Sequence, residues 1–154
     1  MLVKKITMKR RIKAKANKKV RNAISSVYKG IKFRSKLELF TYQQLEQAGI
    51  KSLYEQKKFV LMEGFRFPNR TVEPHKTKGY IDTTVKIRDI TYTPDFVDPN
   101  DKWIIEVKGF ANDVFPLKWK LFKNHLMENN SDYTLFLPKN RKQVLETIDI
   151  IKQL

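Results

Sequence analysis

The sequence predicts an α/β domain in which one mixed sheet carries helices on both faces. Three segments show the apolar spacing of a helix: 35–48, 113–129 and 139–154. Strand patterns fill the region between the first two helices, and one more strand pattern, 132–137, comes before the last helix. This order favours a layered sheet-and-helix fold. With 154 residues and a hydrophobic fraction of 41%, the chain is long and apolar enough for one core.

Positive charge is concentrated at the start of the chain. Lys and Arg number 32 against 16 Asp and Glu, so the net charge is +16. Residues 1–22 include ten of the basic residues, Arg10 and Arg11 among them, and no acidic residue. Because a block of like charge repels itself, we expect a flexible arm over 1–22 and a folded domain over 23–154. A chain this basic is expected to bind a polyanion, and the arm favours nucleic acid over a solvating or targeting tail.

Composition also argues against several classes of protein. No apolar run approaches the length of a membrane span, and the basic N-terminal stretch lacks the apolar centre of a secretory signal. The chain has no cysteine, which excludes disulfides and thiolate metal sites. Its two histidines, His75 and His125, are isolated, which argues against a zinc site. We therefore expect a cytoplasmic protein without membrane contact.

The first helix has clear start and stop signals. Ser35 followed by Glu38 forms a capping box, and Gly49 suits the position just after the helix. The apolar stripe comprises Leu37, Phe40, Leu45 and Ala48. Glu38 therefore has a structural role as a cap, which competes with any chemical one. Before the helix, residues 27–33 predict a short hairpin around Gly30.

The middle of the chain predicts strands separated by a basic, turn-rich segment. Residues 54–62 have the pattern of one strand, and 80–90 are rich in β-forming residues. Between them, 63–79 is punctuated by glycine and proline and predicts a loop or a protruding flap. The second stretch bends or ends at Pro94, beside Asp95, because proline cannot donate a ladder hydrogen bond.

The stretch 92–109 carries the candidate chemistry. Two short strands are joined by Asp98-Pro99-Asn100-Asp101, which favours a tight turn. Side chains alternate along a strand, so Glu106 and Lys108 share one face. The opposite face is expected to enter the core through Trp103, Ile105 and Val107. A hairpin here brings Asp95 alongside Glu106 and Lys108.

Such a set of side chains has a chemical use. Two carboxylates close together repel each other unless a cation lies between them. Oxygen ligands of this kind suit Mg²⁺ or Mn²⁺, which can stabilise charge on a phosphate and help to deprotonate water. A neighbouring lysine can orient that water or stabilise the developing charge. The alternative is an exposed hairpin with solvated charges.

The last third of the chain predicts helix, strand and helix. Asp113 is a candidate N-cap for 113–129, and Pro116 fits the first turn. The expected apolar face of this helix comprises Val114, Leu117, Leu121, Phe122 and Leu126. Its lysines either meet phosphates or form a solvated face. A buried strand at 132–137 stops at Pro138. The closing helix is expected to turn inward Val144, Leu145, Ile148 and Ile151.

Three motifs, in this order, resemble the PD-(D/E)XK nuclease superfamily. They are Phe33-Arg34-Ser35-Lys36-Leu37-Glu38, Tyr92-Thr93-Pro94-Asp95-Phe96 and Ile105-Glu106-Val107-Lys108-Gly109. The arrangement is closest to phage endonuclease I-type Holliday junction resolvases. It also resembles small phage nuclease-like proteins and the DNA-cleaving subunits of some transposases. The resemblance covers about residues 28–125.

The resemblance implies a restriction-endonuclease-like core with a mixed four- to five-stranded sheet flanked by helices. It implies that Asp95, Glu106 and Glu38 bind a divalent metal, Mg²⁺ or Mn²⁺. It implies that Lys108 positions the attacking water or stabilises the transition state. Gln56 matches a place where several relatives carry a polar residue near the site.

The resemblance also implies a metal-dependent endonuclease acting on branched DNA during phage recombination or replication, in the host cytoplasm. DNA contacts are expected from Arg10, Arg11, Arg34, Lys36, Lys118, Lys120 and Lys123. The related resolvases are dimers linked through the region that corresponds to 63–79, so a homodimer is expected. In this chain that region is a dimer bridge, a DNA-clamping flap or a simple hairpin. The alternatives to an endonuclease acting alone are a non-catalytic nucleic-acid-binding protein and a transposase-like subunit that needs a partner.

Overall fold

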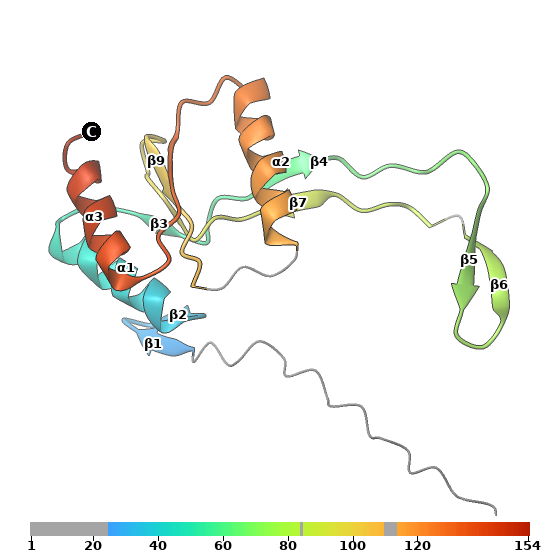
Figure 1. Ribbon diagram of the computed structural model, residues 1–154, viewed down its shortest axis with the longest axis horizontal. Helices are drawn as coiled ribbons and strands as arrows, with labels where there is room; N and C mark the ends of the chain where they lie inside the picture. The colour runs from blue at the N-terminus through green and yellow to red at the C-terminus, as the bar shows by residue number, and fades with distance from the viewer. Residues whose placement is uncertain (1–24, 84, 110–113) are drawn as a thin grey trace, which may run out of the picture.

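The chain folds around a four-stranded mixed sheet with helices on both faces (Figure 1). The structure, a computed structural model, describes residues 25–83, 85–109 and 114–154. The strand order is β10-β9-β8-β3, with β9 and β10 parallel and the other neighbours antiparallel. These strands are β3 (Leu53–Tyr54), β8 (Phe96–Val97), β9 (Trp103–Ile105) and β10 (Thr134–Phe136). The helices are α1 (Lys36–Gln47), α2 (Phe115–Glu128) and α3 (Arg141–Ile151). The mixed α/β architecture is therefore as predicted.

Strand β9 separates two apolar cores. Trp103 and Ile105 pack into the core formed with α1 and α3, and Ile104 enters the other core, with Phe122 of α2. All three β9 residues are buried, and Ile104 and Ile105 are 0% exposed. Because a fully buried side chain of this size stabilises a fold by about 1.5–3 kcal/mol, β9 is held firmly from both sides.

The predicted local signals at the start of the fold are confirmed. Strands β1 (Ser26–Tyr28) and β2 (Ile31–Phe33) form the hairpin, which turns through Lys29 and Gly30, both with positive φ. Helix α1 is capped by Ser35, whose side chain accepts a hydrogen bond from the backbone N–H of Glu38. Gly49 follows the helix with a φ of +70°.

The faces of α2 and α3 differ in part from the prediction. Val114 and Leu117 are 56% and 61% exposed, and the helix buries Phe115 instead. Phe115, Trp119, Phe122 and Leu126 recur at helical spacing on one side, whereas Leu117 lies on the opposite side and Val114 is the N-cap, outside the helix. The expected N-cap, Asp113, lies outside the described residues. Leu145 of α3 is 45% exposed, because the inward spacing is Val144, Ile148, Ile151. Strand β10, expected to be buried, is a partly exposed edge.

The single strand predicted over 54–62 is wrong. The chain forms β3, which pairs with β8, and then a separate strand β4 (Phe59–Met62), which pairs with β7 (Ile90–Tyr92). Glu55 breaks the strand, since its φ of +49° lies in the left-handed region. Its backbone N–H donates to the carbonyl of Asp95 over 2.9 Å, which fixes the bend beside the candidate site.

The predicted flap is a longer two-stranded arm. Beyond β4 and β7, a bridge joins Phe65 to Ile87, and strands β5 (Thr71–His75) and β6 (Gly79–Thr83) form a hairpin at the tip. Figure 1 shows this arm extending away from the helices and the sheet. The protrusion was predicted over 63–79, but it also includes the residues that lead back to β7. Within the described residues, no helix is long and apolar enough to cross a membrane.

Candidate active site

The backbone brings Asp95, Glu106 and Lys108 to one end of the sheet. Asp95 directly precedes β8, and Glu106 directly follows β9, its pairing partner. The Asp95 side chain accepts a hydrogen bond from the backbone N–H of Val107 over 2.7 Å. The backbone N–H groups of Glu106 and Lys108 donate to the carbonyls of Phe136 and Pro138. The predicted convergence of these three residues is thus present and is fixed by sheet hydrogen bonds.

The two carboxylates of this set are held in an unfavourable environment. Burial raises the pKa of the Asp95 carboxyl well above its usual range, and the nearby Glu106 and Glu38 carboxylates add to the rise. Burial also raises the pKa of Glu106, which is only 4% exposed. Lys108 opposes this rise, because its Nζ lies 3.4 Å from Glu106 Oε1. Lys108 thus brings one positive charge to a site with three nearby carboxyl groups, those of Glu38, Asp95 and Glu106.

Two buried oxygens at the site have no hydrogen-bond partner among the described residues: Glu106 Oε2 and the hydroxyl of Tyr92. Burial, followed by the charge of Glu106, raises the pKa of Tyr92, so the hydroxyl keeps its proton. The Tyr92 hydroxyl lies near enough to Glu106 to lower the pKa of that carboxyl as a hydrogen-bond donor does, although the two side chains do not meet the geometry of a hydrogen bond. An unpaired buried carboxylate oxygen is costly, and a bound cation is one way to satisfy it.

Glu38 makes its cap and also lies within the influence of the site. Oε1 accepts from the Ser35 hydroxyl over 2.7 Å, and Oε2 accepts from the backbone N–H of Arg34 and the hydroxyl of Tyr54. The side chain is buried, and its charge contributes to the raised pKa of Asp95. Glu38 therefore caps α1 and also lies near the candidate active site. Its carboxylate already accepts three hydrogen bonds.

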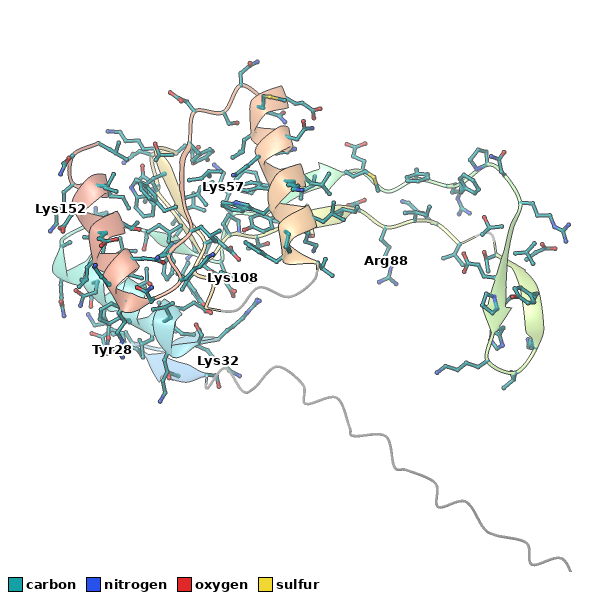
Figure 2. The ribbon with its side chains drawn as sticks, viewed as in Figure 1. Tyr28, Lys32, Lys57, Arg88, Lys108 and Lys152 are labelled. Atoms are coloured by element: carbon teal, nitrogen blue, oxygen red, sulfur yellow. The ribbon has the colours of Figure 1, made fainter. Side chains whose placement is uncertain are left out.

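The carboxylates open into a cavity of 360 Å³. Its walls include Asp95, Glu106 and Lys108 together with two further basic residues, Arg34 and Lys118. Arg34 pairs with Glu55 at 3.0 Å, and Lys118 Nζ donates to the Thr91 carbonyl over 3.3 Å. Figure 2 shows Lys108 near the middle of the view, between α2 and α3, with Arg88 out on the arm. A negatively charged centre with basic walls suits a phosphate group bound through a metal ion.

Of the other predicted DNA-contacting residues, those that the structure describes do not line this cavity. Lys120 and Lys123 line a neighbouring cavity, which also contains Lys108. Lys36 and Gln56 are exposed and are not part of the cavity wall. Arg10 and Arg11 lie outside the described residues. Sequence reasoning missed Tyr54 and Tyr92, whose hydroxyls face the carboxylates; their only signal is a tyrosine within each strand pattern that approaches the site.

The donor set fits a hard divalent cation bound mainly by two carboxylates. Among the described residues, no group of three or more His, Asp or Glu side chains forms a ready metal cluster. Mg²⁺, however, is commonly held by one or two carboxylates, with water and substrate phosphate completing its shell. Asp95 and the unpaired Oε2 of Glu106 can supply those two ligands, with Glu38 behind them.

A family model matches most of the chain. The family is described as a protein of unknown function, DUF1064, and the match covers residues 11–142. No curated protein and no solved structure matches this chain. The chemistry of the site therefore has to be inferred from its own residues.

Proposed function

The chain belongs to the DUF1064 family, and we propose that it is a divalent-metal-dependent endodeoxyribonuclease with a restriction-endonuclease-like core. The observation that carries the proposal is the pair of buried carboxylates, Asp95 and Glu106, with Oε2 of Glu106 unpaired and Lys108 beside it. The motifs Pro94-Asp95 and Glu106-Val107-Lys108 and the net charge of +16 support the same reading.

Each residue of the site has a role in this proposal. Asp95 and Glu106 would hold Mg²⁺ or Mn²⁺, and the bound ion would supply Lewis-acid stabilisation of the phosphate and a more acidic water. The Lys108 ammonium is held between Glu106 and the ring of Phe115, 4.6 Å from the ring centroid. From there it orients the attacking water or stabilises charge on the phosphate oxygens. Glu38 keeps negative charge near Asp95 and fixes the start of α1 against the sheet.

The direct test uses the whole protein with supercoiled plasmid, linear duplex and a four-way junction, each incubated with Mg²⁺, with Mn²⁺ or with EDTA. We expect cleavage that requires the metal and is fastest on the junction, as the resemblance to junction resolvases implies. Cleavage of all three DNAs at equal rates would reject branched DNA as the preferred substrate but keep the nuclease. No cleavage of any DNA with either metal would reject the nuclease.

One observation favours a different candidate, a non-catalytic nucleic-acid-binding protein. The three hydrogen bonds to Glu38 engage the third carboxylate of the expected metal site. Such a protein would bind DNA in a salt-sensitive way, because Lys and Arg contacts to phosphate dominate, and its affinity would not depend on Mg²⁺ or Mn²⁺. Measuring cleavage with Mg²⁺ or Mn²⁺ beside junction affinity by fluorescence anisotropy separates the two candidates, because only the nuclease cuts the DNA that it binds. Unchanged affinity together with no cleavage would favour the binding protein.

A further inference from the structure

A second cavity adjoins the carboxylate cavity. Its volume is 460 Å³, and the two cavities share Lys108 and Phe115 in their walls. The apolar part of the second cavity is formed by Phe115, Trp119 and Leu137. A ligand phosphate at Lys108 would therefore have an apolar, aromatic hollow directly beside it.

The aromatic side chains of this hollow are arranged in layers. The rings of Phe115 and Trp119 are stacked, with centroids 5.8 Å apart and planes inclined by 23°. Trp119 is only partly buried, so part of its surface remains accessible. Nζ of Lys108 lies over the Phe115 ring, and Nζ of Lys123 lies 5.6 Å from the Trp119 centroid. Lysines at aromatic faces attract ligands that carry both a phosphate and a π-system.

The charged side chains in the wall of the second cavity indicate what kind of ligand it suits. The polar residues of the wall are lysines: Lys108, Lys120, Lys123 and Lys139. Among the residues that the structure describes, no acidic side chain is part of the wall, so the described wall suits an apolar group attached to a polyanion. A nucleobase on a sugar-phosphate chain meets both requirements, because every base has a π-face and every nucleotide a negative charge.

We propose that the cavity bounded by Phe115, Trp119 and Leu137 binds an unstacked nucleobase beside the phosphate held at Lys108. This inference rests on the proposed nuclease function and deepens it by naming the substrate class. A base can enter the cavity only if it is unpaired, so the DNA must be single-stranded, frayed or branched next to the cleaved bond. Lys120, Lys123 and Lys139 would contact the flanking phosphates.

The test uses intrinsic tryptophan fluorescence of the full chain in EDTA, where no cleavage is required. The protein has two tryptophans, and Trp103 is 3% exposed in the core, so Trp119 is the expected reporter. Three probes are compared: a thymidine oligonucleotide, the same length of abasic strand, and inorganic polyphosphate. We expect the oligonucleotide to quench emission, and the abasic strand and polyphosphate to bind with little quenching. Equal quenching by all three probes would overturn the proposal.

Binding measurements on Trp119 variants test the base cavity without relying on tryptophan fluorescence. Anisotropy with labelled oligonucleotide is expected to show about tenfold weaker binding for Trp119→Ala, and near wild-type binding for Trp119→Phe, which keeps an aromatic face. Each variant should bind the abasic strand with wild-type affinity, which shows that the fold is intact. Lys142→Ala, at an exposed position of α3, is the surface control. Equal affinity of Trp119→Ala and wild type for the base-bearing strand would contradict the proposal.

The fluorescence test of the base cavity and the cleavage test of the nuclease can fail independently. Base-dependent quenching without cleavage under any metal would reject the nuclease and keep the base cavity. Metal-dependent cleavage with base-independent quenching would keep the nuclease and reject the base cavity.

Discussion

Both ends of the β8–β9 hairpin carry carboxylates. At the turn they have hydrogen-bond or ion-pair partners, whereas at the opposite end one carboxylate oxygen has none among the described residues. At the turn, Asp98 accepts from the backbone N–H of Lys102 over 3.0 Å, and Asp101 pairs with Lys57 at 2.6 Å. The hydrogen bond from Lys57 lowers the pKa of Asp101. At the opposite end, burial raises the pKa of Asp95 and Glu106, and Glu106 Oε2 has no described partner.

The difference separates structural carboxylates from candidate functional ones. Polar groups that only support a fold are normally paired, as Asp98 and Asp101 are. Groups that lower the stability of the apo protein persist where they serve binding or chemistry. The comparison therefore predicts that substituting a carboxylate has different effects on cleavage and on stability at the two ends of the hairpin.

The largest expected difference is in catalysis. Asp95→Asn and Glu106→Gln should each reduce metal-dependent cleavage about 1000-fold, because metal stabilisation of the transition state supplies several kcal/mol. Asp101→Asn, at the other end of the hairpin, should cleave at the wild-type rate. Junction affinity should be unchanged in all three proteins, which anisotropy can verify. Cleavage by Asp95→Asn at the wild-type rate would show that this site does not carry out the reaction.

The next difference is in stability without metal. Glu106→Gln should raise the melting temperature at neutral pH by about 2–4 °C, because it removes a buried carboxylate whose Oε2 has no hydrogen-bond partner among the described residues and whose burial costs about 1 kcal/mol. Asp98→Ala should lower it by a similar amount, because it leaves the Lys102 N–H without its partner. Calorimetry of the two variants in EDTA measures both shifts. A lower melting temperature for Glu106→Gln would show that the carboxylate is already satisfied.

The stability difference should depend on pH with a defined sign. The pKa values of Asp95 and Glu106 are raised in the folded state, so the folded protein holds these protons more tightly than the unfolded chain. These groups therefore destabilise the fold above their folded pKa, and the penalty disappears as pH falls towards the ordinary carboxyl range. The advantage of Glu106→Gln over wild type should shrink on acidification, as chemical denaturation at several pH values can measure. An advantage that grows in acid would contradict the assigned pKa direction.

The smallest predicted effects come from removing the N-caps of α1 and α3. Ser35→Ala and Asn140→Ala each remove a side chain that accepts from a backbone N–H in the first turn, and each should cost about 1 kcal/mol of stability. Only Ser35 also donates to Glu38, so only Ser35→Ala should alter the cleavage rate. Urea denaturation and cleavage assays on both variants make the comparison. Equal loss of activity in the two would show that the effect is on stability alone.

The sequence was sufficient where a local rule determined the structure. Alternation along one strand placed Glu106 and Lys108 together, turn chemistry placed Asp95 beside them, and the capping box fixed the start of α1. Each depends on neighbours within a few residues, which a single sequence displays.

Sequence patterns failed where distant contacts decided the outcome. The left-handed turn at Glu55 depends on the hydrogen bond to the Asp95 carbonyl, 40 positions along the chain, so the segment 54–62 looked like one strand. The contact of Tyr54 with Glu38 joins α1 to β3 and has no local signature. The face of α2 that carries Phe122 and Leu126 packs against residues of the distant strands β7, β8 and β9, which leaves Leu117 on the exposed side.

Anomalous diffraction from a crystal soaked in Mn²⁺ would test the metal site most directly. We predict one strong manganese peak in contact with Asp95 and with Oε2 of Glu106, and its loss in crystals of Glu106→Gln. A peak elsewhere on the protein, or none at these carboxylates in a fully soaked crystal, would contradict a metal-dependent nuclease centred on this end of the sheet.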